Sequence, residues 1–594
     1  MSHGLRRIDR GARVLAVLGL LIALATSLAT VHRFGQERFF TIDEYQYGHA
    51  TWLVSEGRRP YLDFYEHHFP LSYVLHGPLL LGDGSFRERA LRLRLVPFGY
   101  LALLCAVLGV AGYGVTRSVY AALLSALAPL AVGFSLMSAV DYRADNFAAC
   151  LFMACLALLE ANRSWDRRGV ALLCGLLFMV AVFMTQKMVV VGGGTFAAIA
   201  ALDFARRRRA RGAAAPKPFV RHPMAFVASA AAVFAAVIGV GALLGLLPAA
   251  WEATILHASH HERYYPVSSS ALGDYLGPFW QATRWTTVPI LLFAALFFAI
   301  GRSGFWAVAI VVSATATALA KAQYPYNYVF VCYAVALCAV RGYSLVVEGL
   351  RFQGRLGEAI RPLLYLAPLV LLPDQVDFLS RASSNEQQMN MMQKIEAFSS
   401  RDDAVIDGAG GAMFRNHASY YWYHGDAHKV MFADYFRRDL VKDYRRSKAL
   451  FWIIDFRLKK LPWPVHDFQR RHYVQVDRGL FTLGFAVPAT SEASQQFEID
   501  VIRAGDYYVH PAPADAGEEN RQIEPTDRGG LVIDGRRVSG GALRLDEKRY
   551  RITVMPHTPA MILSLLPPEA FEQQIFGNRP YSPLFQYDEP ESGS

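Results

Sequence analysis

Long apolar runs alternate with short polar tracts through the first 375 residues of the chain. A helix needs about 20 apolar residues to cross a bilayer, and several shorter runs are typical of spans broken around a buried site. The pattern predicts a polytopic α-helical membrane protein with about eleven spans. They are expected at 13–31, 95–114, 119–139, 146–161, 170–186, 188–204, 224–248, 287–301, 305–320, 327–341 and 362–375.

The pattern changes after residue 378, where strand-like runs such as DAVIDGAG, KALFWIIDF and HYVQV alternate with helical tracts. We therefore expect a membrane domain at 1–378, with its first outer loop at 32–94, and an α/β unit at 379–490. Short strands between Gly and Asp turns predict a β-sandwich at 491–575. The tail at 576–594 is expected to be disordered.

Composition agrees with a membrane protein, since 53% of the residues are hydrophobic and only 19% are charged. Soluble domains carry about 25% charged residues. The net charge of +10 sits largely in short tracts between apolar runs, so it does not indicate nucleic-acid binding. All six cysteines lie inside apolar runs, so the C-terminal third is not a disulfide-stapled scaffold.

Basic tracts also predict the orientation of the spans, because loops on the cytoplasmic side are rich in Lys and Arg. NRSWDRRG, ARRRRARGAAAPKPFVRH and RGYSLVVEGLRFQGRLGEAIR fall in alternate loops. The N-terminus is then cytoplasmic, and the first run is a retained span rather than a cleaved signal peptide. The outer side receives 32–94, 140–145, the turn at Lys187, 249–286 and the C-terminal domain. The arginines of FRERALRLRL depart from this rule; they predict either a basic helix on lipid headgroups or a phosphate contact.

The stretch Thr41–Pro78 is unusually polar for a tether between two spans. Thr41 and Glu44 match a capping box, which predicts a helix over 43–56 that ends at Gly57. Asp43 then either serves only the helix N-terminus or points at a substrate beside the membrane. His68 precedes a helix that Pro70 opens, and it either faces headgroups or binds substrate.

Other candidate groups lie in the remaining outer segments. Arg143 and Asp145 stand at a helix mouth, either as a structural clamp or as a functional pair. Lys187 either snorkels to the interface or binds an anion. Tyr326 and Tyr328 belong to an outer turn dense in tyrosines, KAQYPYNYVF.

Soluble-enzyme signatures are absent: the sequence holds no Walker loop, dinucleotide fingerprint, CxxC pair or GxSxG. His257 and His261 stand at metal-ligand spacing, but no third ligand follows at fixed spacing. No metal site is therefore predicted from histidine spacing.

The residues Asp43-Glu44-x-x-Tyr47-x-x-Ala50 resemble the first outer loop of the GT-C membrane glycosyltransferases. The pattern is similar to the bacterial protein O-mannosyltransferase-like and aminoarabinose-transferase-like enzymes. Gly57-x-x-Pro60-Tyr61, His68-x-Pro70-Leu71-x-Tyr73 and Arg143-x-Asp145 follow in the family's order. One departure is His67-His68-Phe69-Pro70 where the family often has Lys-Pro-Pro, so a lysine–phosphate contact is not carried over.

The resemblance implies an inverting transfer of a sugar from a polyprenyl-phosphate donor to a hydroxyl of a lipid, polysaccharide or protein. Asp43 would be the general base, and Glu44 and Asp145 would orient its partners or hold a divalent cation. The expected site is the outer side of a bacterial cytoplasmic membrane, in contact with membrane lipids. The residues expected to bind substrate are Tyr47, Tyr61, His68, Tyr73, Arg143, Lys187, Tyr326 and Tyr328.

Two alternatives stay open at this point. A transporter or flippase of lipid-linked glycans would carry ionisable residues along a path through its spans. A non-catalytic protein that binds glycan through its C-terminal sandwich would not depend on Asp43.

Overall fold

The computed structural model of the chain divides into two compact units. The helical unit comprises Met1–Arg38, Glu66–Gly82 and Arg89–Ser384, and the sheet unit comprises Phe39–Tyr65, Asp83–Glu88 and Asn385–Ser594. The first outer loop is therefore split, because its segment with Asp43 folds with the C-terminal residues. The described residues are 2–209, 218–257, 269–300, 304–319, 324–350, 354–380, 384–455, 457–511, 530–538, 541–567 and 569–572.

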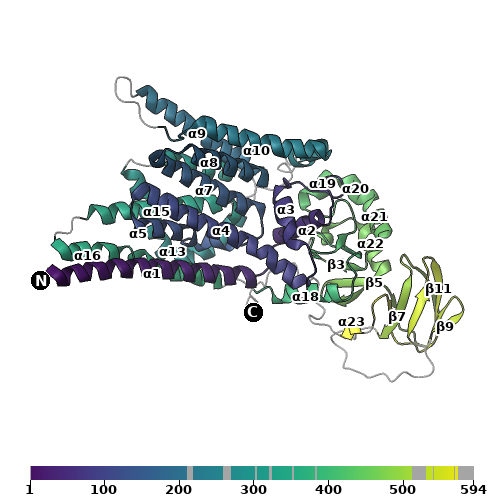
Figure 1. The fold of residues 1–594 in the computed structure, drawn as a ribbon. Helices are drawn as coiled ribbons and strands as arrows, with labels where there is room; N and C mark the ends of the chain where they lie inside the picture. Colours follow the sequence, from purple (N-terminus) through teal and green to yellow (C-terminus); the bar gives the residue numbers. More distant parts are fainter. Residues whose placement is uncertain are drawn as a thin grey trace. The chain divides into compact units, whose positions relative to one another are not determined.

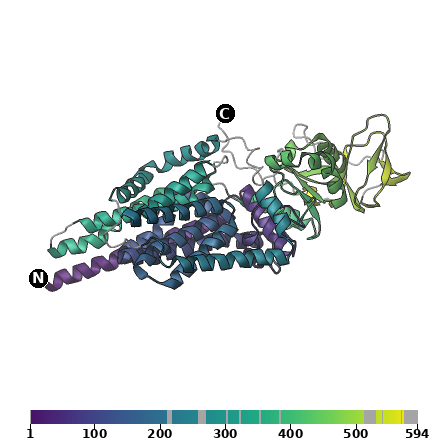
Figure 2. The same cartoon turned by 90° about the horizontal axis from the view of Figure 1, so that it is seen from above.

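The helical unit is built from long helices whose axes are roughly aligned in two perpendicular views (Figures 1 and 2). Its described elements are α1 (Ser2–Glu37), α3 (Leu71–His76), η1 (Gly77–Leu80), α4 (Phe86–Thr116), α5 (Val119–Leu127), η2 (Ala128–Leu130), α6 (Gly133–Ala139), α7 (Ala144–Trp165), α8 (Arg168–Met184), α9 (Lys187–Arg209), α10 (Pro223–Leu243), α11 (Leu247–Trp251), η3 (Glu252–Leu256), α13 (Ser269–Ala299), α14 (Gly304–Leu319), η4 (Pro325–Tyr328), α15 (Val329–Gly349), α16 (Gly354–Leu364), η5 (Ala367–Leu371) and α17 (Leu372–Ser380).

Seven helices in the described ranges are long and apolar enough to cross a membrane, or eight if α5, η2 and α6 form one span bent by 64°. α8 and α14 are apolar but shorter. The predicted polytopic helical fold is confirmed, and seven or eight of the about eleven expected spans meet the length and composition of a membrane helix within the described residues. The stretch 362–375 is not one span, because it is divided among α16, η5 and α17.

α7 lies at the centre of the helical unit, where 94% of its most apolar window is buried. It packs against α8 and α15. Neighbouring helices also approach closely: a Cβ on Gly342 of α15 would lie 2.0 Å from the carbonyl oxygen of Phe293 on α13. Small residues permit such contacts between membrane helices, where dispersion forces drive packing.

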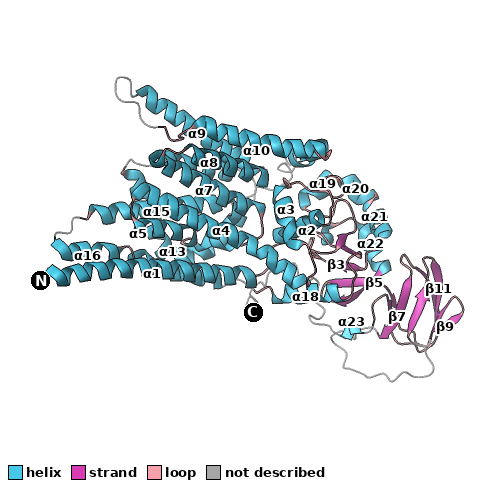
Figure 3. Ribbon diagram, in the orientation of Figure 1, coloured by secondary structure: helices cyan, strands magenta, loops and turns pink. Residues whose placement is uncertain are grey.

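The sheet unit mixes helices and strands (Figure 3). Its described helices are α2 (Ile42–Ser55), α18 (Glu386–Ala397), α19 (Asp426–Met431), α20 (Ala433–Arg438), α21 (Leu440–Ser447), η6 (Leu458–Lys460), α22 (Trp463–His472) and α23 (Glu569–Glu572). Its described strands are β1 (Ala404–Ile406), β2 (Asn416–His417), β3 (Phe451–Ile453), β4 (Tyr473–Asp477), β5 (Leu480–Val487), β6 (Gln495–Asp500), β7 (Gly505–Pro511), β8 (Leu531–Ile533), β9 (Arg536–Val538), β10 (Ala542–Leu545), β11 (Arg549–Val554) and β12 (Met561–Ser564).

An eight-stranded sheet has the order β10-β7-β12-β5-β3-β1-β2, with β4 also paired to β5, and a second sheet has the order β6-β11-β8-β9. β1 runs parallel to β2 and β3, and the other pairs are antiparallel. β5 pairs with strands on both sides of residue 490, so the larger sheet is continuous across that position. The tail predicted to be disordered, 576–594, lies outside the described residues.

Two apolar cores stabilise the sheet unit. In the first, Phe436, Tyr444 and Phe468 from α20, α21 and α22 pack on Trp452 of β3 and its neighbours. In the second, residues of both sheets face each other, with Leu563 of β12 in the same cluster as residues of β8 and β11. Alternating inward side chains of this kind are typical of a sandwich.

Candidate functional site

The helix that carries Asp43 begins as the sequence predicts. Thr41 Oγ1 accepts a hydrogen bond from the Glu44 N–H (3.4 Å), and Glu44 Oε2 accepts one from the Thr41 N–H (3.1 Å). α2 ends at Gly57, whose φ of 79° suits a glycine. The capping box and the glycine stop are confirmed. Asp43 lies half-buried in the same turn. The capping box uses the side chains of Thr41 and Glu44 and not the Asp43 carboxylate.

α2 packs within the sheet unit against the loop that follows β1. A Cβ on Gly48 would lie 2.5 Å from Met413 Sδ, and one on Gly410 would lie 2.9 Å from His49 Cβ. His49 Nδ1 lies 2.9 Å from the Met413 carbonyl oxygen, so it donates, and Nε2 accepts from His417 Nδ1 (3.1 Å). These contacts fix the orientation of α2 and hence of Asp43.

Two acidic residues lie just beyond the ends of the parallel strands β1 and β3, at the same edge of the sheet. Asp407 shapes the loop after β1, because its carboxylate accepts hydrogen bonds from the N–H groups of Ala409 (2.9 Å) and Ala412 (3.2 Å). Asp455 follows β3 and is fully buried. Burial raises the pKa of Asp455 to about 6, although the nearby Arg457 lowers it.

Arg457 links this edge of the sheet to Asp43. Its guanidinium donates to the Tyr423 hydroxyl (2.8 Å) and the Gly408 carbonyl (3.3 Å), and it lies 4.1 Å from the centroid of the Tyr423 ring. Burial lowers the pKa of Arg457, but Tyr423, Asp455 and Asp43 raise it more, and the net shift is upward. The charge of Asp43 therefore acts on a buried guanidinium that two other groups hold in place.

Within the helical unit, a second ionic cluster forms around Asp145 at the start of α7. Asp145 Oδ1 accepts from the Thr185 hydroxyl (2.8 Å), and Oδ2 lies 2.9 Å from Lys187 Nζ and 3.8 Å from Arg143 Nη2. Asp145 and Arg143 are buried, whereas the Lys187 side chain is 50% exposed. We call these four residues the Asp145 cluster.

An aromatic ring lies against both cations of the Asp145 cluster. The Arg143 guanidinium lies 3.4 Å and Lys187 Nζ 4.7 Å from the Tyr326 ring centroid. Lys187 Nζ also donates to Asn327 Oδ1 (3.0 Å). Two cations share one carboxylate here, so the cluster carries a net positive charge suited to an anion. Tyr328, two residues after Tyr326, is half-buried.

Three tyrosines expected to bind substrate have little exposed surface. Tyr47 of α2 is 2% exposed, Tyr61 is 3% and Tyr73 of α3 is 0%. Tyr61 adopts a φ of 68°, and its carbonyl accepts from the Tyr420 hydroxyl (2.6 Å). Their burial supports a role in packing the segments that carry Asp43 and His68, and their substrate contacts stay a prediction.

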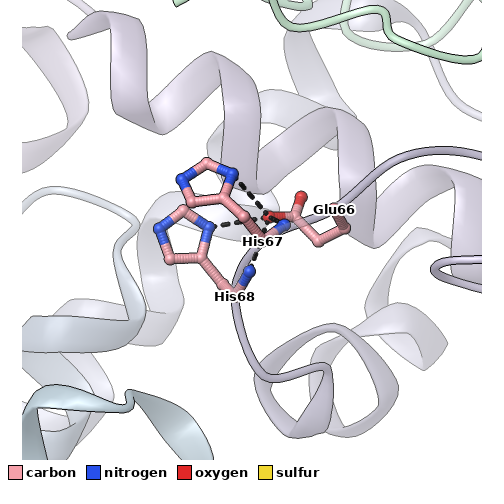
Figure 4. Close-up of side chains that lie close together, drawn as sticks. All are labelled: Glu66, His67 and His68. Atoms are coloured by element: carbon pink, nitrogen blue, oxygen red, sulfur yellow. Dashed lines mark hydrogen bonds and ion pairs between the residues drawn. The ribbon is translucent and has the colours of Figure 1, made fainter. Parts of the chain in front are cut away.

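His68 lies beside Glu66 and His67, where the chain leads into α3 (Figure 4). His68 Nδ1 is 2.7 Å from Glu66 Oε1. Among the described residues, these three form the group of His, Cys, Asp or Glu side chains with donor atoms close enough to hold one metal ion. The other histidine pair from the sequence is only half described: His257 lies 3.7 Å from Glu252, and 258–268 lies outside the described residues.

The arginines after residue 85 form no separate surface helix, since they belong to the first turns of α4. Arg94 is buried, and its guanidinium donates to the carbonyl groups of Gln36 and Arg38. The Arg94 guanidinium is therefore occupied within the protein, and the headgroup and phosphate interpretations stay predictions for the other arginines of this stretch.

Solved structures with the same fold include ArnT from Cupriavidus metallidurans. The apo structure matches with a TM-score of 0.51 and 14% identity over 74% of this chain and 93% of that one. The structure bound to undecaprenyl phosphate matches with a TM-score of 0.50 and 14% identity over 76% of this chain and 95% of that one. No family model and no curated protein sequence matches. The chain has the GT-C fold, as the resemblance of its first outer loop implied.

Several residues of these clusters escaped the sequence reasoning: Thr185, Asn327, Tyr423, Asp455 and Arg457. The first two are neutral, and neither forms a recognisable pattern. Asp455 and Arg457 carry a usable signal, because they follow the buried run FWII directly. Polar groups just beyond the carboxyl end of a parallel strand often form a site.

Proposed function

We propose that the chain is an inverting glycosyltransferase that moves a sugar from a polyprenyl-phosphate donor to an acceptor hydroxyl at the outer side of the cytoplasmic membrane. The observation that carries this proposal is the Asp145 cluster, in which Lys187 and Arg143 lie against one aromatic ring and share one carboxylate. A half-exposed cation beside a buried one suits a phosphate group.

Asp43 acts as the general base. Its carboxylate removes the proton from the acceptor hydroxyl while that oxygen attacks the anomeric carbon. The bond from the anomeric carbon to the phosphate oxygen breaks, and polyprenyl phosphate leaves with the electron pair. One displacement inverts the anomeric centre and requires one positioned carboxylate, whereas retention would require a second carboxylate as nucleophile.

The leaving phosphate gains negative charge in the transition state, so fixed cations near it lower the barrier. Lys187 and Arg143 supply that charge. Asp145 holds both cations, and the Thr185 hydroxyl donates to Asp145. The undecaprenyl phosphate in one ArnT structure supports a polyprenyl carrier for this chain too. The acceptor is a lipid, a polysaccharide or a protein.

A transporter of lipid-linked glycans is the competing proposal, and it requires ionisable groups along a path through the spans. Within the described residues, an ionic pair away from the Asp145 cluster joins two spanning helices: buried Arg341 lies 3.3 Å from Glu160. By the distribution of basic loops, that pair belongs to the cytoplasmic end. A closed pair at one end favours a structural role and gives no support to a transport path.

The test is release of polyprenyl phosphate by the purified full-length protein in vesicles. A panel of polyprenyl-phosphate sugars is supplied together with a membrane extract as the acceptor source. We expect turnover of at least one donor and release of one polyprenyl phosphate for each sugar transferred. Movement of intact donor between leaflets without release would instead establish the transporter.

Arg457 is proposed as a positioning residue for Asp43. Arg457→Ala is expected to lower kcat by about 100-fold, because a small displacement of a catalytic group has effects of that size. The KM for the donor should change far less, and Arg457→Lys should recover part of kcat because the positive charge returns.

The matched control is Arg401→Ala, which removes an exposed arginine that pairs with Glu56 in the same unit. It should leave kcat and thermal stability unchanged, since such surface pairs contribute little. A fall in kcat for Arg457→Ala that only parallels a loss of folded protein would refute the positioning role.

A further inference from the structure

Three adjacent residues with metal-binding side chains gather just before α3. Glu66 is buried, and the side chains of His67 and His68 are 17% and 20% exposed. Figure 4 shows the two imidazole rings side by side, with nitrogen atoms facing the carboxylate. One donor atom from each residue lies within 4.8 Å of the others. All three belong to the helical unit.

Glu66 is held in a fixed position. Its Oε1 accepts hydrogen bonds from the backbone N–H groups of His67 (2.9 Å) and His68 (3.0 Å). Gln186 Nε2 donates to the His67 carbonyl (2.5 Å), which anchors the same segment to the rest of the unit. Supporting contacts of this kind orient metal ligands in proteins.

The other carboxylate oxygen of Glu66 is the observation that points to a ligand. Oε2 is buried, and no hydrogen-bond partner for it lies in the part of the chain that the structure describes. A buried carboxylate oxygen without a partner is costly. A turn held by Oε1 alone explains the backbone contacts, but it explains neither the buried Oε2 nor the two imidazoles beside it.

We propose that Glu66, His67 and His68 bind a divalent transition-metal ion, with zinc as the preferred ion. Two imidazoles and one carboxylate suit zinc, whereas magnesium and calcium prefer oxygen ligands. Neighbouring ligands of tetrahedral zinc lie about 3.3 Å apart for bonds of about 2.0 Å. The Glu66 carboxylate lies beside both imidazoles, with Oε1 2.7 Å from His68 Nδ1 and 3.7 Å from His67 Nδ1. Rotation of the carboxyl group and of the two rings would let Oε2 join the imidazole nitrogens around one ion, while Oε1 keeps its backbone hydrogen bonds.

Zinc would replace the contact between His68 Nδ1 and Glu66 Oε1, with the His68 proton on Nε2. Three protein ligands leave one tetrahedral position open for water or an anion. The proposal does not depend on glycosyl transfer, and its test measures metal rather than activity.

The experiment uses the full-length protein in detergent. The protein is stripped with a chelator, incubated with zinc sulfate in the presence of excess magnesium, and separated from free metal by gel filtration. Metal content is measured by inductively coupled plasma mass spectrometry. We expect about one zinc per chain, and bound cobalt should give the visible absorption of a tetrahedral site.

Glu66→Gln and His68→Ala should each lower the bound zinc at least tenfold, with gel filtration confirming that both variants stay folded. His67→Asn provides a second, milder test at the neighbouring ligand. The control is His222→Ala, because His222 also contacts a carboxylate, that of Asp166 (3.1 Å), but has no third donor beside it among the described residues. Wild-type protein without zinc, or equal zinc in wild type, Glu66→Gln and His68→Ala, would overturn the proposal.

Discussion

Asp43→Asn should lower the rate of polyprenyl-phosphate release by about 10²–10⁴-fold, the usual contribution of a general base. Asparagine has nearly the same shape, and the capping box uses Thr41 and Glu44, so α2 should remain intact. The measurement is single-turnover release from a defined donor, together with the melting temperature of the same preparation.

The result separates two roles for Asp43. A carboxylate that serves only the helix N-terminus stabilises the helix by about 0.3–1 kcal/mol and has no direct effect on turnover. A lower melting temperature with unchanged turnover would therefore refute the assignment of Asp43 as base. Asp63→Asn is the matched control, because Asp63 lies in the same unit and its carboxylate contacts Arg59, at the guanidinium (3.0 Å) and at the backbone N–H (2.7 Å).

The sequence predicts α2 almost to the residue, because both of its ends depend on local chemistry. Thr41 and Glu44 bond each other across one turn, and Gly57 provides the left-handed residue that ends the helix. Spans are also predictable where apolar runs are long enough. The positions where helices break are not predictable from proline alone. Pro97 lies inside the continuous helix α4, whereas the segment around Pro368 is divided into short helices.

The partners of Asp43 could not be predicted, because they are distant in the sequence. Arg457, on which the charge of Asp43 acts, and Tyr423, which accepts a hydrogen bond from Arg457, both come from the C-terminal third. Composition likewise gives no reason for the first outer loop to fold with that part of the chain. Arg143 and Asp145 are two positions apart, so the sequence suggests their pairing. Lys187 contacts Asp145 from another helix, which the sequence does not reveal.

Lys187→Met is expected to lower kcat for sugar transfer by about 10²–10³-fold, as the loss of one group that stabilises developing charge commonly does. The half-exposed ammonium can contact a phosphate while Asp145 holds it. Lys187→Arg keeps the charge and should retain most activity. The measurement is kcat with a saturating donor, compared with the melting temperature of each variant.

A structural role for Lys187 predicts a different pattern of kcat and melting temperature. Arg143 still faces Asp145 when Lys187 is removed, so the buried carboxylate keeps one cation. If Lys187 only holds Asp145 in place, the fall in kcat of Lys187→Met should follow the loss of folded protein, and if it acts on the leaving phosphate, kcat should fall far more than that loss explains. A fall in kcat that only parallels the melting temperature would therefore remove Lys187 from the proposed mechanism and leave Arg143 as the remaining cation of the cluster.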